Sequence, residues 1–133
     1  MLNPELYLGN IKITNDEDVK YLGHIISRDL KDDKDMLKQI RSLYCRSNML
    51  MRKFSRCSDY IKCTLFKAYC SNIYCCSLWF RYTQNVYHRL RVAYNNSCRI
   101  LLGLPMRCSA SQMLVYSEVP SFGEIVRKQC YSW

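Results

Sequence analysis

The chain has 133 residues, a hydrophobic fraction of 49%, an aromatic fraction of 13% and a formal net charge of +9. A chain of this length and apolar content can bury one core, which excludes the class of disordered, strongly polar segments. No apolar stretch reaches the roughly 18 residues of a membrane span and no secretory signal opens the chain, so we expect an intracellular protein, nuclear or cytoplasmic, without a membrane partner.

The first part of the chain has the residue pattern of short β-strands. Residues 5–14 form two short runs around Gly9-Asn10, a two-residue turn typical of a hairpin. Residues 19–26 are rich in β-branched and aromatic side chains and predict a third strand. We expect these strands to form a small antiparallel sheet that is too small to be stable alone.

A helical period begins at Asp33. Over about 33–55 the apolar residues fall on one arc of a helix of about 20 residues, and basic residues fall on an adjoining arc. Residues 59–82 are apolar on nearly every side, which predicts a central, buried helix that starts at a cap formed by Ser58 or Asp59.

A third long helix is predicted over about 84–102, with Gly103 and Pro105 as its stop signals. Capping-box patterns at 109–112 and 121–124 predict two short helices after it. The predicted fold class is α+β and mainly α. A short N-terminal hairpin or three-stranded sheet would precede a bundle of about three long and two short helices.

The charge is distributed unevenly along the chain. Residues 1–37 carry five Lys/Arg and eight acidic residues, whereas residues 38–133 carry 15 Lys/Arg and three acidic residues. A region this basic suits a polyanion, and nucleic acid is the commonest one. A generally basic surface explains the charge alone equally well.

Nine cysteines raise the question of disulfides or structural zinc. The sequence contains no C-x-x-C pattern, and its two histidines, His24 and His88, stand far apart. Five cysteines lie on or beside the predicted buried helix, where a thiol acts as a small apolar core group. They are Cys57, Cys63, Cys70, Cys75 and Cys76. We therefore expect reduced thiols, no bound metal and no cofactor.

A cluster of carboxylates precedes the first long helix, at Asp29, Asp32, Asp33 and Asp35. Metal-dependent phosphoryl transfer needs carboxylates fixed on rigid elements, usually from separate segments. Here Asp32 and Asp33 lie at the start of a predicted helix, where carboxylates accept hydrogen bonds from free backbone N–H groups. We favour this helix-capping role over a magnesium site and expect no polymerase activity from this chain alone.

Several segments closely resemble the region that follows the catalytic palm motifs in non-LTR retrotransposon reverse transcriptases. The resemblance runs from about Val19 to about Phe122 and keeps order and spacing. It rests on the Tyr-Leu-Gly triplet at 21–23, the Cys/Tyr-rich predicted helix and the Arg-x-Ser-Ala-Ser segment at 107–111. The upstream Ala-Asp-Asp motif of that family is absent from this sequence.

The resemblance implies a fragment of an RNA-directed DNA polymerase that is inactive alone. In that family the Leu-Gly motif belongs to the hairpin that grips the primer, and the helices after it form the thumb and a C-terminal connection. The implied parts are a palm-remnant hairpin over 1–30, a thumb-like helical bundle over 31–106 and an apparently truncated helical extension over 107–133. The parent polymerase would use Mg²⁺.

Two groups of residues are expected to contact an RNA/DNA template–primer duplex. The hairpin strip, which the resemblance puts near the primer 3′ end, consists of Lys20, Tyr21, Leu22 and Gly23. The basic arc, which would contact phosphates without reading sequence, consists of Lys38, Arg41, Arg52 and Arg56. Secondary candidates are Arg46, Lys53 and Lys62. The alternatives are an ordinary strand with a glycine bulge and a solvated helix face.

A second hypothesis is a helical protein-interaction module whose exposed apolar surface docks the missing palm portion or another protein. A non-functional remnant of a mobile element is a further alternative. Phosphate binding should weaken steeply with salt, whereas apolar docking should not. A stand-alone enzyme has little support, because neither histidine has a nearby sequence partner for nucleophilic catalysis.

Overall fold

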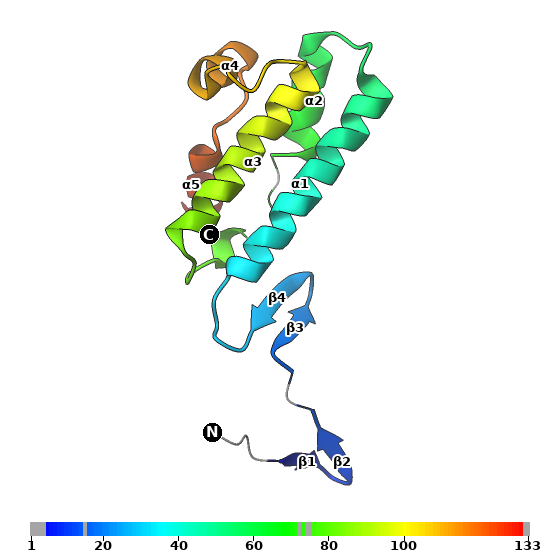
Figure 1. The fold of residues 1–133 in the computed structure, drawn as a ribbon, viewed down its shortest axis with the longest axis vertical. Coiled ribbons are helices and arrows are strands. Elements are labelled where there is room, and N and C mark those ends of the chain that lie inside the picture. Colours follow the sequence, from blue (N-terminus) through cyan, green and yellow to red (C-terminus); the bar gives the residue numbers. More distant parts are fainter. Residues whose placement is uncertain (1–4, 15, 72, 74–75, 132–133) are drawn as a thin grey trace.

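The computed structural model describes residues 5–14, 16–71, 73 and 76–131. Within these residues two hairpins precede five α-helices (Figure 1). The strands are β1 (Leu6–Leu8), β2 (Ile11–Ile13), β3 (Asp18–Tyr21) and β4 (His24–Ser27). The helices are α1 (Asp33–Phe54), α2 (Asp59–Tyr69), α3 (Gln84–Leu102), α4 (Ala110–Ser117) and α5 (Phe122–Tyr131), and a short 3₁₀ helix, η1 (Cys76–Leu78), precedes α3. The predicted fold class, α+β and mainly α, is confirmed.

The strands form two separate hairpins, so the predicted three-stranded sheet was wrong. β1 pairs with β2, and β3 pairs with β4, antiparallel in both cases. Residues 19–26 do not form one strand, because the chain reverses at Leu22-Gly23, where φ is 49° and 81°. A turn with two positive φ angles matches the twist of paired strands, which favours a tight hairpin here.

The β1–β2 hairpin lies at one end of the molecule, apart from the helices (Figure 1). Its strand register puts four exposed aliphatic side chains on one side, which we call the aliphatic face. The aliphatic face consists of Leu6, Leu8, Ile11 and Ile13. On the other side Tyr7 Oη and Lys12 Nζ both donate to the Glu5 carboxylate, at 3.2 and 2.8 Å. The polar side is therefore satisfied internally, while the aliphatic face stays bare.

α1 and α3 run in the same direction and pack along their lengths (Figure 1). Thr83 donates to Asp33 at their starts and Ser47 to Ser97 midway, so each contact joins residues 50 positions apart. Each helix buries one stripe spaced by three or four residues, the pattern of an amphipathic helix. The buried residues are Asp35, Met36, Gln39, Leu43, Ser47 and Leu50 on α1, and Val86, Leu90, Ala93, Tyr94, Ser97, Cys98 and Leu101 on α3. Both helices were predicted correctly.

The predicted buried helix over 59–82 was wrong in length and in burial, because α2 buries only Cys63 and Phe66 and exposes Tyr60 and Tyr69. α2 ends at Tyr69, and the backbone before α3 bonds to the start of α1 instead, for example from the Asp32 N–H to the Arg81 carbonyl at 2.7 Å. These tertiary hydrogen bonds replace helical ones. Among the described side chains of this segment Ile73, Cys76 and Trp79 are buried, and Leu78 and Phe80 are exposed.

The C-terminal helices complete the core. Gly103 ends α3 with a φ of 68°, as the stop signal predicted. Ser121 Oγ accepts from the Glu124 N–H at 3.3 Å, which is half of the predicted capping box. Core residues contributed by α4, α5 and the turn between them are Met113, Val119, Phe122 and Ile125. None of the described helices is long and apolar enough to cross a membrane.

Candidate nucleic-acid interface

The hairpin strip occupies β3 and the turn that follows it. Lys20, Tyr21 and Leu22 are exposed. A positive φ costs little for glycine and is unfavourable for most other residues, so the turn needs Gly23 for its backbone conformation. The alternative of a glycine bulge within one strand was wrong, and close approach of nucleic acid to this glycine stays a prediction.

Two lysines of α1 hold this hairpin against the helix. Lys38 Nζ donates to the Gly23 carbonyl oxygen. Lys34 Nζ lies 2.6 Å from Asp18 Oδ2, and this hydrogen bond raises the pKa of Lys34. Lys38 was a predicted phosphate contact, and its half-buried ammonium uses one of its three N–H donors on the turn. Lys38 therefore fixes the hairpin, and its contact with phosphate stays a prediction.

A groove of about 360 Å³ lies between the hairpin and α1. Its lining residues are Asp18, Val19, Lys20, Ile25, Lys34, Leu37 and Arg41. The groove brings together Lys20 from β3 and Arg41 from α1, two of the predicted site residues. Asp18 is paired with Lys34, whereas neither Lys20 nor Arg41 has a hydrogen-bond or ion-pair partner among the described residues. The groove therefore presents two available cations over partly apolar walls.

The basic arc continues along α1 beyond the groove. Arg41, Cys45, Asn48 and Arg52 are exposed and spaced by four, three and four residues, which puts them on one side of the helix. Arg41 and Arg52 are separated by about 16 Å along the axis at 1.5 Å per residue. Arg56 is exposed in the turn after α1. These exposed groups form a second strip, on α1, that starts at the groove and follows the helix.

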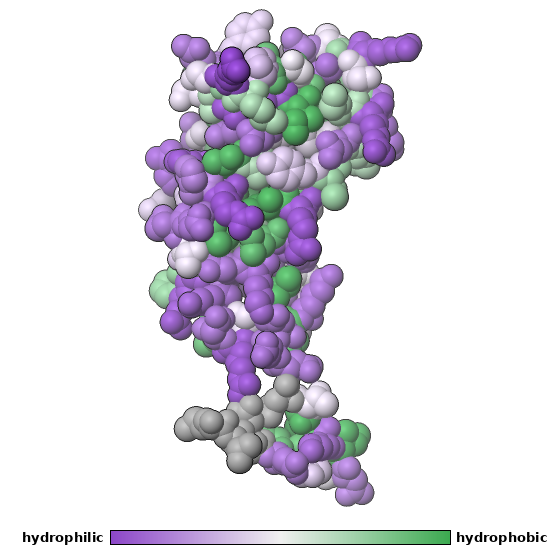
Figure 2. Space-filling model, viewed as in Figure 1, coloured by the Kyte–Doolittle hydropathy of each residue, from purple (hydrophilic) through white to green (hydrophobic). Residues whose placement is uncertain are grey.

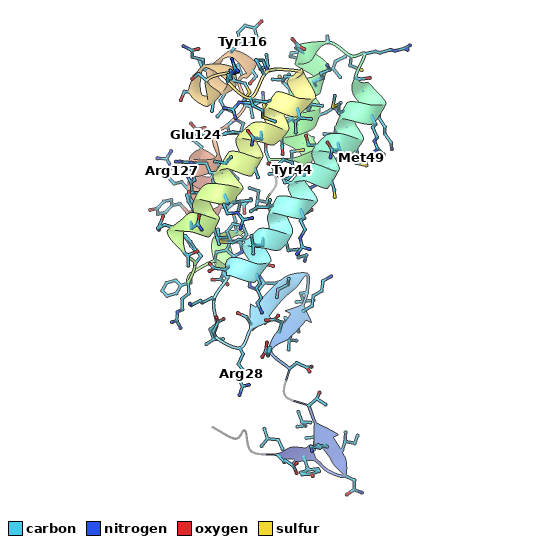
Figure 3. All side chains as sticks on the ribbon, in the orientation of Figure 1. Arg28, Tyr44, Met49, Tyr116, Glu124 and Arg127 are labelled. Carbon is cyan, nitrogen blue, oxygen red and sulfur yellow. The ribbon has the colours of Figure 1, made fainter. Side chains whose placement is uncertain are left out.

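Two side chains of α1 that flank this strip are labelled in Figure 3. Tyr44 lies on the side toward α3, and Met49 lies on the opposite side. Met49 lines a hollow of about 410 Å³ together with Arg52 and Lys53, a secondary candidate. Arg46 instead donates from Nη1 to the Tyr69 carbonyl at 2.8 Å and so joins α1 to α2. The exposed part of the basic arc lies opposite the buried stripe of α1 and so faces away from α3.

The aspartates at the start of α1 do not cap the helix as predicted. Asp32 makes no side-chain cap hydrogen bond, and its Oδ2 accepts from the backbone N–H groups of Phe80 and Arg81 at 2.8 and 2.9 Å. Asp33 Oδ1 accepts from the Thr83 N–H at 2.8 Å. Both carboxylates therefore fasten the segment before α3 to the start of α1.

Asp35 is fully buried and joins three parts of the chain. Its Oδ1 accepts from the Ile25 N–H at 3.1 Å, and its Oδ2 accepts from Trp79 Nε1 at 2.8 Å. His24 Nδ1 also lies 2.9 Å from Oδ2, without a hydrogen bond to it. The other ring nitrogen, Nε2, lies 3.5 Å from Asp32 Oδ1. No sequence pattern indicates that these residues lie in contact.

N–H donors already point at these carboxylates, and their positive ends would repel a cation at the same oxygens. Asp29, the remaining acid of the cluster, accepts from Ser27 Oγ at 2.6 Å, and this bond lowers the pKa of Asp29. In the part of the chain that the structure describes, no group of three or more His, Cys, Asp or Glu side chains is arranged to hold a metal ion. The carboxylates thus act as hydrogen-bond acceptors.

Three of the five cysteines that we predicted as core groups are core residues, and the absence of a bound metal or cofactor stays a prediction. Cys63, Cys70 and Cys76 are buried, and Cys57 is half-buried. Burial raises the pKa of Cys70 to about 11, so its thiol stays protonated. Cys75 lies outside the described residues.

Comparisons with protein-family models, with curated proteins and with solved structures found no match to this chain. A functional proposal therefore depends on the geometry of the groove and on the sequence resemblance.

Proposed function

We propose that this chain is a nucleic-acid-contacting module related to the thumb region of a retrotransposon RNA-directed DNA polymerase. The observation that carries the proposal is the groove in which Lys20 and Arg41, from separate elements, line one hollow. The exposed Arg52 and Arg56 extend the same strip along α1. Such a strip suits the phosphates of a template–primer duplex, which it would position without reading base sequence.

Arginine and an exposed helix face fit this role for a physical reason. Each guanidinium is always charged and presents a planar fork of N–H donors that matches phosphate oxygens. Arg41 and Arg52 are about 16 Å apart along α1 at the usual helical rise. One DNA strand advances about 3.4 Å per phosphate, so several phosphates span this distance. The spacing therefore allows the two arginines to contact one strand.

The proposed module is inactive as a polymerase by itself. Its sequence lacks the Ala-Asp-Asp motif, and the Asp32 and Asp33 oxygens accept backbone N–H groups. Magnesium would belong to the palm of a parent polymerase, and this chain would hold no cofactor. An intracellular location, in the nucleus or the cytoplasm, is part of the same proposal.

The aliphatic face favours a second candidate function, a protein-interaction module. Hydrophobic residues are visible on the β1–β2 hairpin beside hydrophilic ones (Figure 2). Leu8 and Ile11 are 74% and 72% exposed there. A two-stranded hairpin of this size is marginal in water, so a partner sheet or helix would stabilise it. The palm portion of a polymerase or another protein could be that partner.

A salt titration tests the proposal and separates the two candidates. Binding of the chain to a labelled RNA/DNA hybrid duplex is measured by fluorescence anisotropy at increasing salt. Four phosphate contacts, by Lys20, Arg41, Arg52 and Arg56, should give a log–log slope of roughly −3 to −4. Absence of salt-dependent binding would reject the nucleic-acid proposal. Association that is insensitive to salt would support the interaction module.

A further inference from the structure

We propose that Asp35 is a positioning residue of this interface. Its buried carboxylate holds the β3–β4 hairpin at the place on α1 where Lys20 and Arg41 can contact the same nucleic acid. This inference rests on the proposed function and adds to it the group that assembles the site.

The β3–β4 hairpin has little apolar packing to hold it in place. Every residue of β3 is exposed, and the one buried residue of β4 is Ser27. The core cluster contains no residue of the described hairpins. The position of this hairpin therefore depends on its polar contacts with α1.

Among those contacts, the ones to Asp35 are the best protected from water. The pair between Lys34 and Asp18 is exposed, and exposed ion pairs contribute little to stability. Asp35 is 0% exposed, and removal of a donor to a buried charge leaves that charge uncompensated. Lys38 contributes a half-buried bond to the turn itself. The buried carboxylate is thus the strongest restraint on the body of the hairpin.

A short structural path leads from Asp35 to Lys20. The carboxylate accepts the backbone N–H of Ile25, and Ile25 is the direct register partner of Lys20 across the hairpin. Opposite residues of an antiparallel pair point to the same side, and Ile25 and Lys20 line the same groove. Trp79 Nε1 holds the second carboxylate oxygen from the other side, which fixes the orientation of the carboxylate. Fixing Ile25 therefore fixes Lys20 opposite Arg41.

A double-mutant cycle tests this path. The salt slope of hybrid-duplex binding is measured for the wild type, Lys20→Ala, Asp35→Asn and the double variant. In the wild type Lys20→Ala should flatten the slope by about 0.9, the contribution of one phosphate contact. Asp35→Asn should flatten it by a similar amount, and Lys20→Ala should then add less than half of its wild-type effect. A merely structural role of Asp35 would leave the Lys20 effect unchanged.

Asp33→Asn is the matched control. It removes the same charge from the same end of α1, but Asp33 bonds to Thr83 and not to the hairpin. The full effect of Lys20→Ala should persist in that background. If circular dichroism shows that Asp35→Asn is unfolded, Trp79→Phe replaces it, because this change removes the N–H donor and keeps an aromatic ring.

The outcomes separate the inference from the function on which it rests. Wild-type protein without salt-dependent binding would reject the proposed function. Salt-dependent binding in which Lys20→Ala acts equally in the wild-type and Asp35→Asn (or Trp79→Phe) backgrounds would overturn the positioning role alone. No effect of Lys20→Ala in the wild type would overturn it as well.

Discussion

The Ser47 hydroxyl on α1 donates to the backbone carbonyl of Ser97 on α3 across 2.9 Å, and both side chains are fully buried. The Ser97 hydroxyl in turn donates to the Ala93 carbonyl at 2.8 Å, so both hydroxyls are satisfied. Because the separation of packed helices depends on the side chains between them, two serines allow a close approach. This contact sets the spacing of the helix pair that carries the basic arc.

Replacement of Ser47 by leucine should destabilise the protein more than replacement by alanine. Ser47→Ala removes one hydrogen bond and should lower the free energy of unfolding by about 1 kcal/mol. Ser47→Leu inserts a large side chain into a full contact and should cost about 1–3 kcal/mol or more. Urea unfolding followed by circular dichroism measures both. Equal costs would mean that the helices are not closely packed at this point.

Removal of two arginines from the basic arc should weaken binding to all duplex sequences alike. The double variant Arg41→Ala, Arg52→Ala should flatten the salt slope by about two, because two phosphate contacts are lost. The matched control is Arg127→Ala, Lys128→Ala, which removes two exposed charges from α5 (Figure 3). Equal flattening by the control would show that binding follows total charge rather than this strip.

The thiols should fall into two classes in the native protein. Cys45 and Cys130 are exposed, whereas Cys70 and Cys98 are buried and burial raises their pKa values to about 11 and about 12. Alkylation requires both access and the thiolate form. At about pH 8 we expect mass spectrometry to find fast labelling at the exposed pair and protection of the buried pair. Equal labelling rates without denaturant would contradict the burial of Cys70 and Cys98.

The buried thiols should also make the protein less stable in alkali. Their pKa values are raised on folding, so above about pH 8.5 the unfolded chain loses thiol protons that the folded chain keeps. The unfolded state then binds fewer protons, and the free energy of unfolding falls as the pH rises. The free energy of unfolding should keep falling until the pH reaches the pKa of each folded thiol, about 11 for Cys70 and about 12 for Cys98. Urea unfolding between about pH 8.5 and 10.5 should give a shallower decline for Cys98→Ala than for the wild type; parallel declines would exclude this thiol as a cause.

The aliphatic face should contribute little to the stability of the isolated chain. Leu8 and Ile11 are largely exposed and lie on a hairpin apart from the helices. Replacement of both by threonine should therefore change the free energy of unfolding by less than about 0.5 kcal/mol. Urea unfolding of the double variant checks this. A loss above about 1 kcal/mol would show that this face is covered in solution, which sedimentation could then assign to self-association.

The sequence by itself determined the elements whose signals are local. α1 and α3 follow from helical periodicity, and Gly103 ends α3 because an αL position favours glycine. The separation of basic and apolar arcs on α1 also comes from residues a few positions apart, so Arg41 and Arg52 could be predicted as exposed. Lys20 became a candidate through resemblance, and its place in the groove could not be foreseen.

Only the tertiary structure decided what the buried polar groups do. Asp35 accepts a hydrogen bond from Trp79, 44 positions away in the sequence, and Asp33 accepts one from Thr83, 50 positions away. No periodicity links residues at such separations. The second helix ends at Tyr69, and the backbone at residues 80 and 81 bonds to Asp32 instead of to a helical turn. Local pattern therefore set which residues of α1 and α3 face water, and long-range hydrogen bonds set where the β3–β4 hairpin lies.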